Sequence, residues 1–117
     1  MIKFNYINPL ISIIICTNNS ERTIKDTINS IVIQKYKNYE IIIIDNFSTD
    51  NTIKIIKAYK LRKVRIFISS DNGIYNAINK GIKKSYGEII SILHSDDFYY
   101  NSSTLFSIIK IFKEKKN

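Results

Sequence analysis

The feature that most constrains the fold is a change of hydrophobic period that recurs four times along the chain. Four short apolar runs, rich in isoleucine, have the length and composition of buried strands: residues 10–17, 39–45, 64–69 and 88–93. Each run is followed by a segment whose apolar residues recur at the spacing of one helical face, namely residues 20–34, 48–59, 73–87 and 102–116. This alternation predicts strands and helices in strict succession.

The connections between these segments are short, which favours right-handed crossovers between neighbouring parallel strands. We therefore predict an α/β, Rossmann-like fold with a mostly parallel sheet and helices on both faces, in the order β-α-β-α-β-α-β-α. Residues 1–117 form one domain in this interpretation, with residues 1–9 as a lead segment. Gly87 follows the third helical segment and is predicted to be its C-cap.

The composition is that of a globular protein, with 44% hydrophobic and 24% charged residues. A formal net charge of +8 favours partners that carry phosphate, although an ordinary solvated basic surface explains the same charge. The single cysteine, Cys16, excludes an internal disulfide and a cysteine-based metal cluster. The apolar run ISIIICT is far shorter than the roughly 20 residues that cross a bilayer. We expect a cytoplasmic protein, either free or peripheral at the inner face of a membrane.

Polar residues follow all four predicted strands. They are Thr17, Asn18 and Asn19, then Asp45 and Asn46, then residues 69–73, and finally residues 94–97. Ligands of open α/β sheets bind outside the carboxyl ends of the strands, where these residues would meet. Asparagine and aspartate are also ordinary turn formers, so each cluster alone proves little. Their joint placement favours a binding site.

Known signatures narrow the chemistry of that site. The chain has no glycine-rich dinucleotide fingerprint, no P-loop and no nucleophile elbow. Asp96 and Asp97 remain, and a hard divalent cation is often held by one or two carboxylates together with substrate phosphates. Neighbouring side chains on an extended backbone point to opposite sides. We therefore expect one carboxylate on a metal and the other on a ribose hydroxyl or a backbone amide.

Two long stretches resemble the N-terminal, nucleotide-sugar-binding half of the family 2 glycosyltransferases, which have the GT-A fold. They are ISIIICTNNSERTIKDTINSIVIQKYKNYEIIIIDNFSTDNT and SSDNGIYNAINKGIKKSYGEIISILHSDDF. The motifs IDxxSTDxT, DxGIYxAxNKG and SDDF occur in this order and carry the resemblance. It extends from about Leu10 to the last helical segment, which is nearly the whole chain.

The resemblance implies a nucleotide-diphosphate sugar donor, with a UDP-sugar favoured, and Mn²⁺ or Mg²⁺ as the cofactor. It implies that Asp97 is the metal ligand and that Asp96 lies by the ribose or the diphosphate. It places the following further residues around the donor: Cys16, Thr17, Asn19, Asp45, Asn46, Asp71, Gly73, Asn79 and Lys80. Among them, Asp45 matches the residue that reads the base, and Lys80 could meet phosphate charge. An exposed helix face explains Asn79 and Lys80 equally well.

The chain departs from the family pattern in three respects. Asn18 stands where members commonly have an aromatic residue, and Phe47 replaces a common glycine, which leaves the base of the donor open. The chain ends at Asn117, before the acceptor-binding half that supplies the catalytic base in the family. We therefore expect a truncated enzyme that transfers sugar to a lipid-linked or polysaccharide acceptor, and we find no candidate for its base.

A second interpretation is a non-catalytic nucleotide-binding or interaction remnant of the same fold. We expect no nucleic-acid partner, because the aromatic residues are not interleaved with Lys and Arg on one face. A missing second half or a homodimer would cover an apolar patch that we expect near the end of the fourth strand.

Overall fold

A computed structural model describes residues 7–70 and 73–114 of the chain, which alternate between strands and helices throughout. The elements are β1 (Ile11–Thr17), α1 (Ile24–Val32), β2 (Tyr39–Asp45), α2 (Thr52–Ala58), β3 (Val64–Ile68), α3 (Ile74–Lys84), β4 (Ile89–His94) and α4 (Thr104–Glu114). The predicted order of elements is confirmed. Within the described residues, no helix has both the length and the apolar character needed to cross a membrane.

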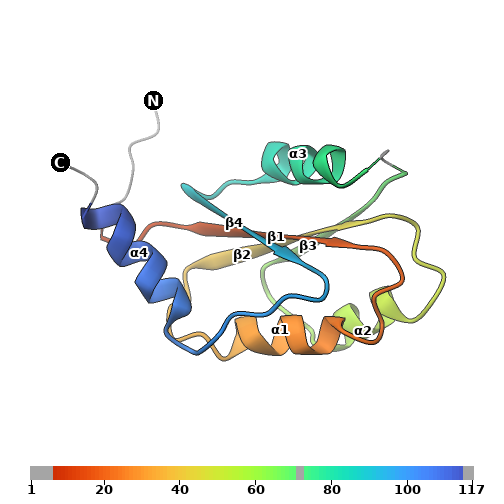
Figure 1. Cartoon of the computed structure of the whole chain (residues 1–117), viewed down its shortest axis with the longest axis horizontal. Helices are drawn as coiled ribbons and strands as arrows, with labels where there is room; N and C mark the ends of the chain where they lie inside the picture. The colour runs from red at the N-terminus through yellow and green to blue at the C-terminus, as the bar shows by residue number, and fades with distance from the viewer. Residues whose placement is uncertain (1–6, 71–72, 115–117) are drawn as a thin grey trace.

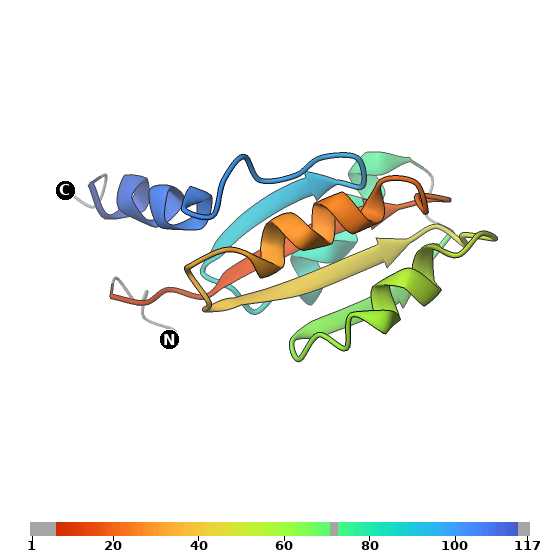
Figure 2. The same cartoon turned by 90° about the horizontal axis from the view of Figure 1, so that it is seen from below.

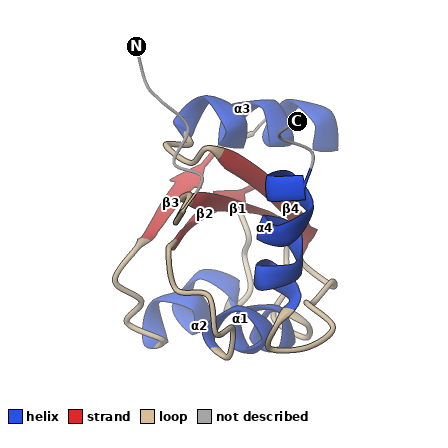
Figure 3. Ribbon diagram, turned by 90° about the vertical axis from the view of Figure 1, so that its left-hand side faces the viewer, coloured by secondary structure: helices blue, strands red, loops and turns tan. Residues whose placement is uncertain are grey.

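The four strands form one parallel sheet in the order β3-β2-β1-β4. Helices α1 and α2 lie on one face and α3 lies on the other, as Figures 1 and 3 show. Figure 2, seen from below, shows α1 lying over the sheet roughly along the direction of the strands, and α2 lying beside β3. The predicted α/β fold with helices on both faces is therefore confirmed, and every strand pair is parallel.

The core explains why the first two strands are nearly continuous runs of isoleucine. Ile11, Ile13 and Ile15 of β1 belong to the large core under α1, α2 and α4, whereas Ile14 points to the opposite face toward α3. All four side chains are fully buried. Central strands covered on both faces have no polar face, so their sequences do not alternate.

The edge strand β4 is covered less completely. Ile90 and Ile92 pair in register with Ser12 and Ile14, so they point to the α3 face of the sheet. Because α3 packs over β1 and β2, these two side chains stay 37% and 41% exposed. Two apolar side chains of the fourth strand are therefore partly exposed, and the contiguous patch expected near its end stays a prediction.

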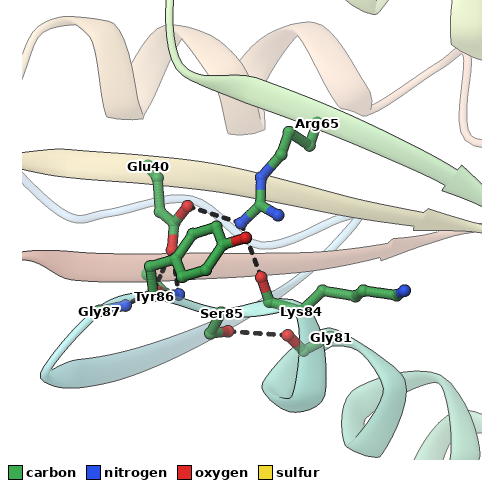
Figure 4. Close-up of polar contacts among 8 residues, drawn as sticks. Glu40, Arg65, Gly81, Lys84, Ser85, Tyr86 and Gly87 are labelled. Carbon is green, nitrogen blue, oxygen red and sulfur yellow. Dashed lines mark hydrogen bonds and ion pairs between the residues drawn. The ribbon is translucent and has the colours of Figure 1, made fainter.

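A partly buried ionic network closes the amino-terminal end of the sheet (Figure 4). The Glu40 carboxylate accepts hydrogen bonds from Ser12 Oγ (2.5 Å), from the Tyr86 N–H (2.7 Å) and from the Arg65 guanidinium (2.8 Å). Arg65 also donates to the Lys84 carbonyl (2.6 Å) and lies over the Tyr86 ring, 4.6 Å from its centroid. These bonds fix the connection between α3 and β4 against β1, β2 and β3.

Gly87 belongs to this connection and does not cap the helix. The C-cap of α3 is Ser85, two residues earlier, so the prediction from the sequence was wrong. The Gly87 N–H donates to Ser12 Oγ (2.7 Å), and a Cβ at this position would collide with the Ser12 backbone and hydroxyl. A glycine is needed here because the backbone approaches β1 too closely for any side chain.

Candidate functional site

An open cleft of about 610 Å³ lies along the carboxyl ends of the strands. Residues from the ends of all four strands and from the start of α3 line it, as expected for an open α/β sheet. The predicted site residues that line the cleft are Cys16, Thr17, Asn19, Asn46, Gly73 and Asp96. Asp71, also predicted, lies outside the described residues.

Asp45 does not line the cleft, although its neighbour Asn46 does. The Asp45 side chain is 1% exposed and accepts hydrogen bonds from Thr17 Oγ1 (2.5 Å), the Ser48 N–H (2.8 Å) and Ser48 Oγ (2.6 Å). Its carboxylate therefore ties the end of β1 to the loop after β2. Asn46 is exposed at the same strand end, and only its backbone takes part in hydrogen bonds among the described residues.

Asn19 joins the two loops that border the cleft. Its side-chain oxygen accepts hydrogen bonds from the backbone N–H groups of Thr49 (2.7 Å) and Asp50 (3.3 Å). The residue has a φ of 47°, a left-handed conformation that asparagine tolerates better than most residues. Asn19 thus shapes the wall of the cleft while its side-chain oxygen is engaged within the protein.

The two adjacent aspartates after β4 have different surroundings. Asp96 is exposed and lines the cleft. Asp97 is also exposed, but its carboxylate turns back to accept a hydrogen bond from the His94 N–H (3.1 Å) and does not line the cleft. The two carboxylates take separate positions, but the backbone here is a turn closed by a hydrogen bond from the Asp97 N–H to the His94 carbonyl (2.9 Å) and not the extended strand that was expected.

The donor set fits a hard divalent cation only if a substrate completes it. No group of three or more His, Cys, Asp or Glu side chains within residues 7–70 and 73–114 could hold a metal alone. One or two carboxylates with substrate phosphates are, however, a common set for Mg²⁺. Asp96 supplies one such carboxylate in the wall of the cleft, and Asp97 is the next residue in the chain.

Lys80 and Asn79 lie on α3 but do not line the cleft. The Lys80 ammonium donates to Ser69 Oγ (2.7 Å), and Ser69 does line it. Lys80 is therefore connected to the wall at the end of β3, whereas Asn79 lies on an exposed part of the helix.

Cys16 lines the cleft and is half-buried. Burial raises the pKa of its thiol above the ordinary value of 9.0, so the thiol stays protonated at neutral pH. This fits the role of wall residue better than that of nucleophile.

Arg22 and Thr23 also line the cleft, and neither was predicted from the sequence to be a site residue. They lie between β1 and α1, where the polar pattern was interpreted as the start of a helix. The sequence did contain a signal for Arg22: it is a positively charged residue a few positions after the end of β1, where other site residues lie.

Comparison with known proteins gives a consistent result. The sequence profile of Glycosyl transferase family 2 matches residues 12–117. A glycosyltransferase of Rickettsia conorii, described as uncharacterized, is 41% identical over 98 residues, which are 82% of this chain and 16% of that protein. A Bacillus subtilis glycosyltransferase named for teichuronic acid biosynthesis is 34% identical over 92 residues, covering 76% of this chain and 36% of the relative. The chain thus spans well under half the length of these relatives.

Solved structures share the architecture. TarS of S. aureus in complex with UDP has a TM-score of 0.82 and 28% identity, covering 89% of this chain and 32% of the TarS chain. A mannosyltransferase of Pyrobaculum calidifontis in complex with GDP-Man and Mn²⁺ has a TM-score of 0.79 and 20% identity, covering 94% of this chain and 33% of the other. The second likeness concerns the fold alone.

Proposed function

Since this chain belongs to glycosyl transferase family 2, we propose that its cleft binds a nucleotide-diphosphate sugar together with Mn²⁺ or Mg²⁺. The match over residues 12–117 confirms the family that the sequence motifs predicted. The observation that carries the proposal is the placement of Asn46 and Asp96 in one open cleft, at strand ends separated by β1. A nucleotide lying across the strand ends would contact both.

In this proposal the nucleoside lies at the β2 end of the cleft. Asn46 offers a free amide that can donate to and accept from a base edge, since its backbone alone is engaged among the described residues. Asp45 then supports the base site indirectly, because its carboxylate holds Thr17 and Ser48 in place. A UDP-sugar remains the favoured donor, supported by the likeness to TarS, whose structure contains UDP.

The diphosphate and the cation lie at the β4 end, near Asp96 and Asp97. Asp97 is the proposed metal ligand, because a carboxylate that accepts one N–H bond has lone pairs left for a cation. A bound divalent cation would offset the charge that develops on the leaving diphosphate. Asp96, which lines the cleft, would contact the ribose or the diphosphate.

The proposed reaction is sugar transfer to a lipid-linked or polysaccharide acceptor. Its support is the family itself and the relative named for teichuronic acid biosynthesis. We propose a cytoplasmic protein that can lie at the inner face of a membrane, where it would reach a lipid-linked acceptor. We assign no residue of this chain as the base that deprotonates the acceptor.

Isothermal titration of the chain with UDP and with GDP, each with and without Mn²⁺, tests donor binding. We expect metal-dependent binding of one nucleotide, weakened by Asp97→Asn and by Asn46→Ala. The matched control is Asp26→Asn, which removes a carboxylate from the exposed side of α1. Absence of binding to the wild type, or an unchanged isotherm for Asp97→Asn, would contradict the proposal.

The non-catalytic alternative predicts binding without turnover. A competent donor site transfers some sugar to water even without an acceptor, so release of UDP from UDP-sugars distinguishes the two functions. Release that depends on Mn²⁺ and falls in Asp97→Asn supports the enzyme. Tight binding with no release above the rate in buffer supports the nucleotide-binding module.

A further inference from the structure

Arg22 has a distinctive position in the cleft. It is exposed between β1 and α1 and lines the cleft together with Ser95 and Asp96 at the end of β4. Among the described residues that line the cleft, it is the one lysine or arginine. Arg22 therefore brings a positive charge to the cleft, and its neighbour Thr23 is bonded to the Ser95 carbonyl, next to Asp96.

The acidic side chains of Glu21 and Asp50 are hydrogen-bonded to other groups and form no ion pair with Arg22 among the described residues. Glu21 accepts a hydrogen bond from the Asn51 N–H (3.2 Å). Asp50 accepts from the Glu21 N–H (3.2 Å) and from the backbone and hydroxyl of Thr52 (2.9 and 2.5 Å). Across the described parts of the chain, the Arg22 guanidinium makes no hydrogen bond or ion pair. It is therefore available to a ligand.

The backbone that carries Arg22 is held firmly against the end of β4. Thr23 Oγ1 donates to the Ser95 carbonyl (2.8 Å), and Thr27 Oγ1 donates to the same carbonyl (3.1 Å). On the other side, the Ser20 N–H donates to Thr52 Oγ1 (2.7 Å). The distance between the Arg22 backbone and the Asp96 backbone is thus set by the fold, which limits the positions that the guanidinium can reach.

We propose that Arg22 binds the diphosphate of the nucleotide donor, an inference that rests on the proposed function. The planar guanidinium presents paired N–H donors that match two phosphate oxygens, and such charge-assisted pairs are stronger than neutral hydrogen bonds. The diphosphate of a nucleotide sugar carries two negative charges, which one divalent cation balances, so Asp96 and Asp97 leave this part of the site with net negative charge. Arg22 compensates this charge from the α1 side of the cleft, opposite the position of α3.

The test is a titration of the wild type, Arg22→Gln and Arg22→Lys with uridine, UMP and UDP, and with the guanosine series, all with Mn²⁺. We expect Arg22→Gln to weaken binding of the diphosphate about 10- to 100-fold and to leave nucleoside binding unchanged. Arg22→Lys keeps the positive charge but lacks the paired N–H donors, so its affinity for the diphosphate should lie between those of the wild type and Arg22→Gln. Lys25→Gln is the matched control, because Lys25 is exposed on α1 and does not line the cleft.

The outcomes separate this inference from the proposed function. Equal diphosphate affinity in the wild type and Arg22→Gln overturns the role of Arg22 and leaves donor binding intact. Equal loss for nucleoside and diphosphate also overturns it. If the wild type binds no nucleotide, both proposals fail. Circular dichroism and the urea midpoint check that each variant is folded.

Discussion

Asp45 and Asn46 are adjacent in the chain but have opposite environments. The Asp45 carboxylate is buried and accepts three hydrogen bonds, whereas the Asn46 side chain faces the cleft. At this strand end only Asn46 lines the cleft, because the Asp45 carboxylate is bonded to Thr17 and Ser48. The sequence motifs predicted that both residues lie around the donor. Their surroundings in the structure favour a positioning role for Asp45 and a direct contact for Asn46.

Asp45→Ala is therefore expected to lower the stability of the fold, which a residue that only contacted the base would not do when substituted. The substitution leaves buried donors from Thr17 and Ser48 without an acceptor, at a cost of about 2–4 kcal/mol in the free energy of unfolding. Urea unfolding of the variant and the wild type measures this loss in the free energy of unfolding. Asn46→Ala is the control and should stay within about 0.5 kcal/mol of the wild type, because its side chain is exposed. Similar stability for both variants would contradict this assignment.

Glu40 gives a pH-dependent prediction at the same scale. Burial by itself would raise its pKa, but hydrogen bonds from Ser12, the Tyr86 N–H and Arg65, with the charge of Arg65, hold the pKa below its ordinary value of 4.5. A carboxyl group with a lowered pKa in the folded state stabilises the fold fully above its unfolded-state pKa. That contribution is lost as the pH falls from about 4.5 through the lower folded-state value.

Glu40→Gln should therefore lower the free energy of unfolding at neutral pH by about 2 kcal/mol, a value that allows for the partial exposure of Arg65. The difference between variant and wild type should shrink as the pH falls below 4.5, and urea titrations at several pH values measure it. A difference that does not change between neutral and acidic pH would show that ionisation of Glu40 contributes nothing.

At the scale of elements, α3 lies unusually close to the sheet. A Cβ on Gly81 would stand 2.6 Å from Ile14 Cγ2, closer than side-chain atoms can approach. Gly81 is buried, and Ala77 packs one turn earlier against the same core. The small residues along this helix therefore set its distance from β1 and β2, and with it the position of Gly73 and Ile74 in the cleft wall.

Gly81→Ala is expected to destabilise the chain by about 1–3 kcal/mol through overpacking, despite a gain of roughly 1 kcal/mol in helix propensity. Combining it with Ile14→Ala should cost less than the sum of the two single substitutions, because the cavity at Ile14 receives the new methyl group. Thermal unfolding of the four proteins measures this coupling. Lys83→Ala, on the exposed side of α3, should be nearly neutral, and strictly additive effects at positions 14 and 81 would refute the close contact.

At the scale of the whole molecule, the sheet is covered unevenly. The α1 side is protected by α1, α2 and α4, whereas on the α3 side Ile90 and Ile92 of β4 remain exposed. Ile74 and Ile82 of α3 are 40% and 43% exposed. Exposed apolar surface favours association, while the net charge of +8 opposes it.

The chain is therefore expected to self-associate as its concentration or the ionic strength rises, because salt screens the repulsion between molecules. Sedimentation velocity over a range of concentrations measures this effect. The double substitution Ile90→Lys and Ile92→Lys should reduce the concentration dependence with little change in stability, since both side chains are already partly exposed. Lys83→Ala again serves as the control, and equal association in all three proteins would rule out this face.

The sequence by itself determined the order of elements, the parallel sheet and the strand end at which each polar cluster lies. These properties follow from local hydrophobic period and from the geometry of βαβ connections, which a linear pattern records. Only the tertiary structure decided which polar groups are free. Asp45 and Asn19 use their oxygens within the protein, Arg22 keeps its charge unpaired among the described residues, and Gly87 serves close packing. Such roles depend on partners far away in the chain, because a side chain is available to a ligand only when no neighbour in space has satisfied it.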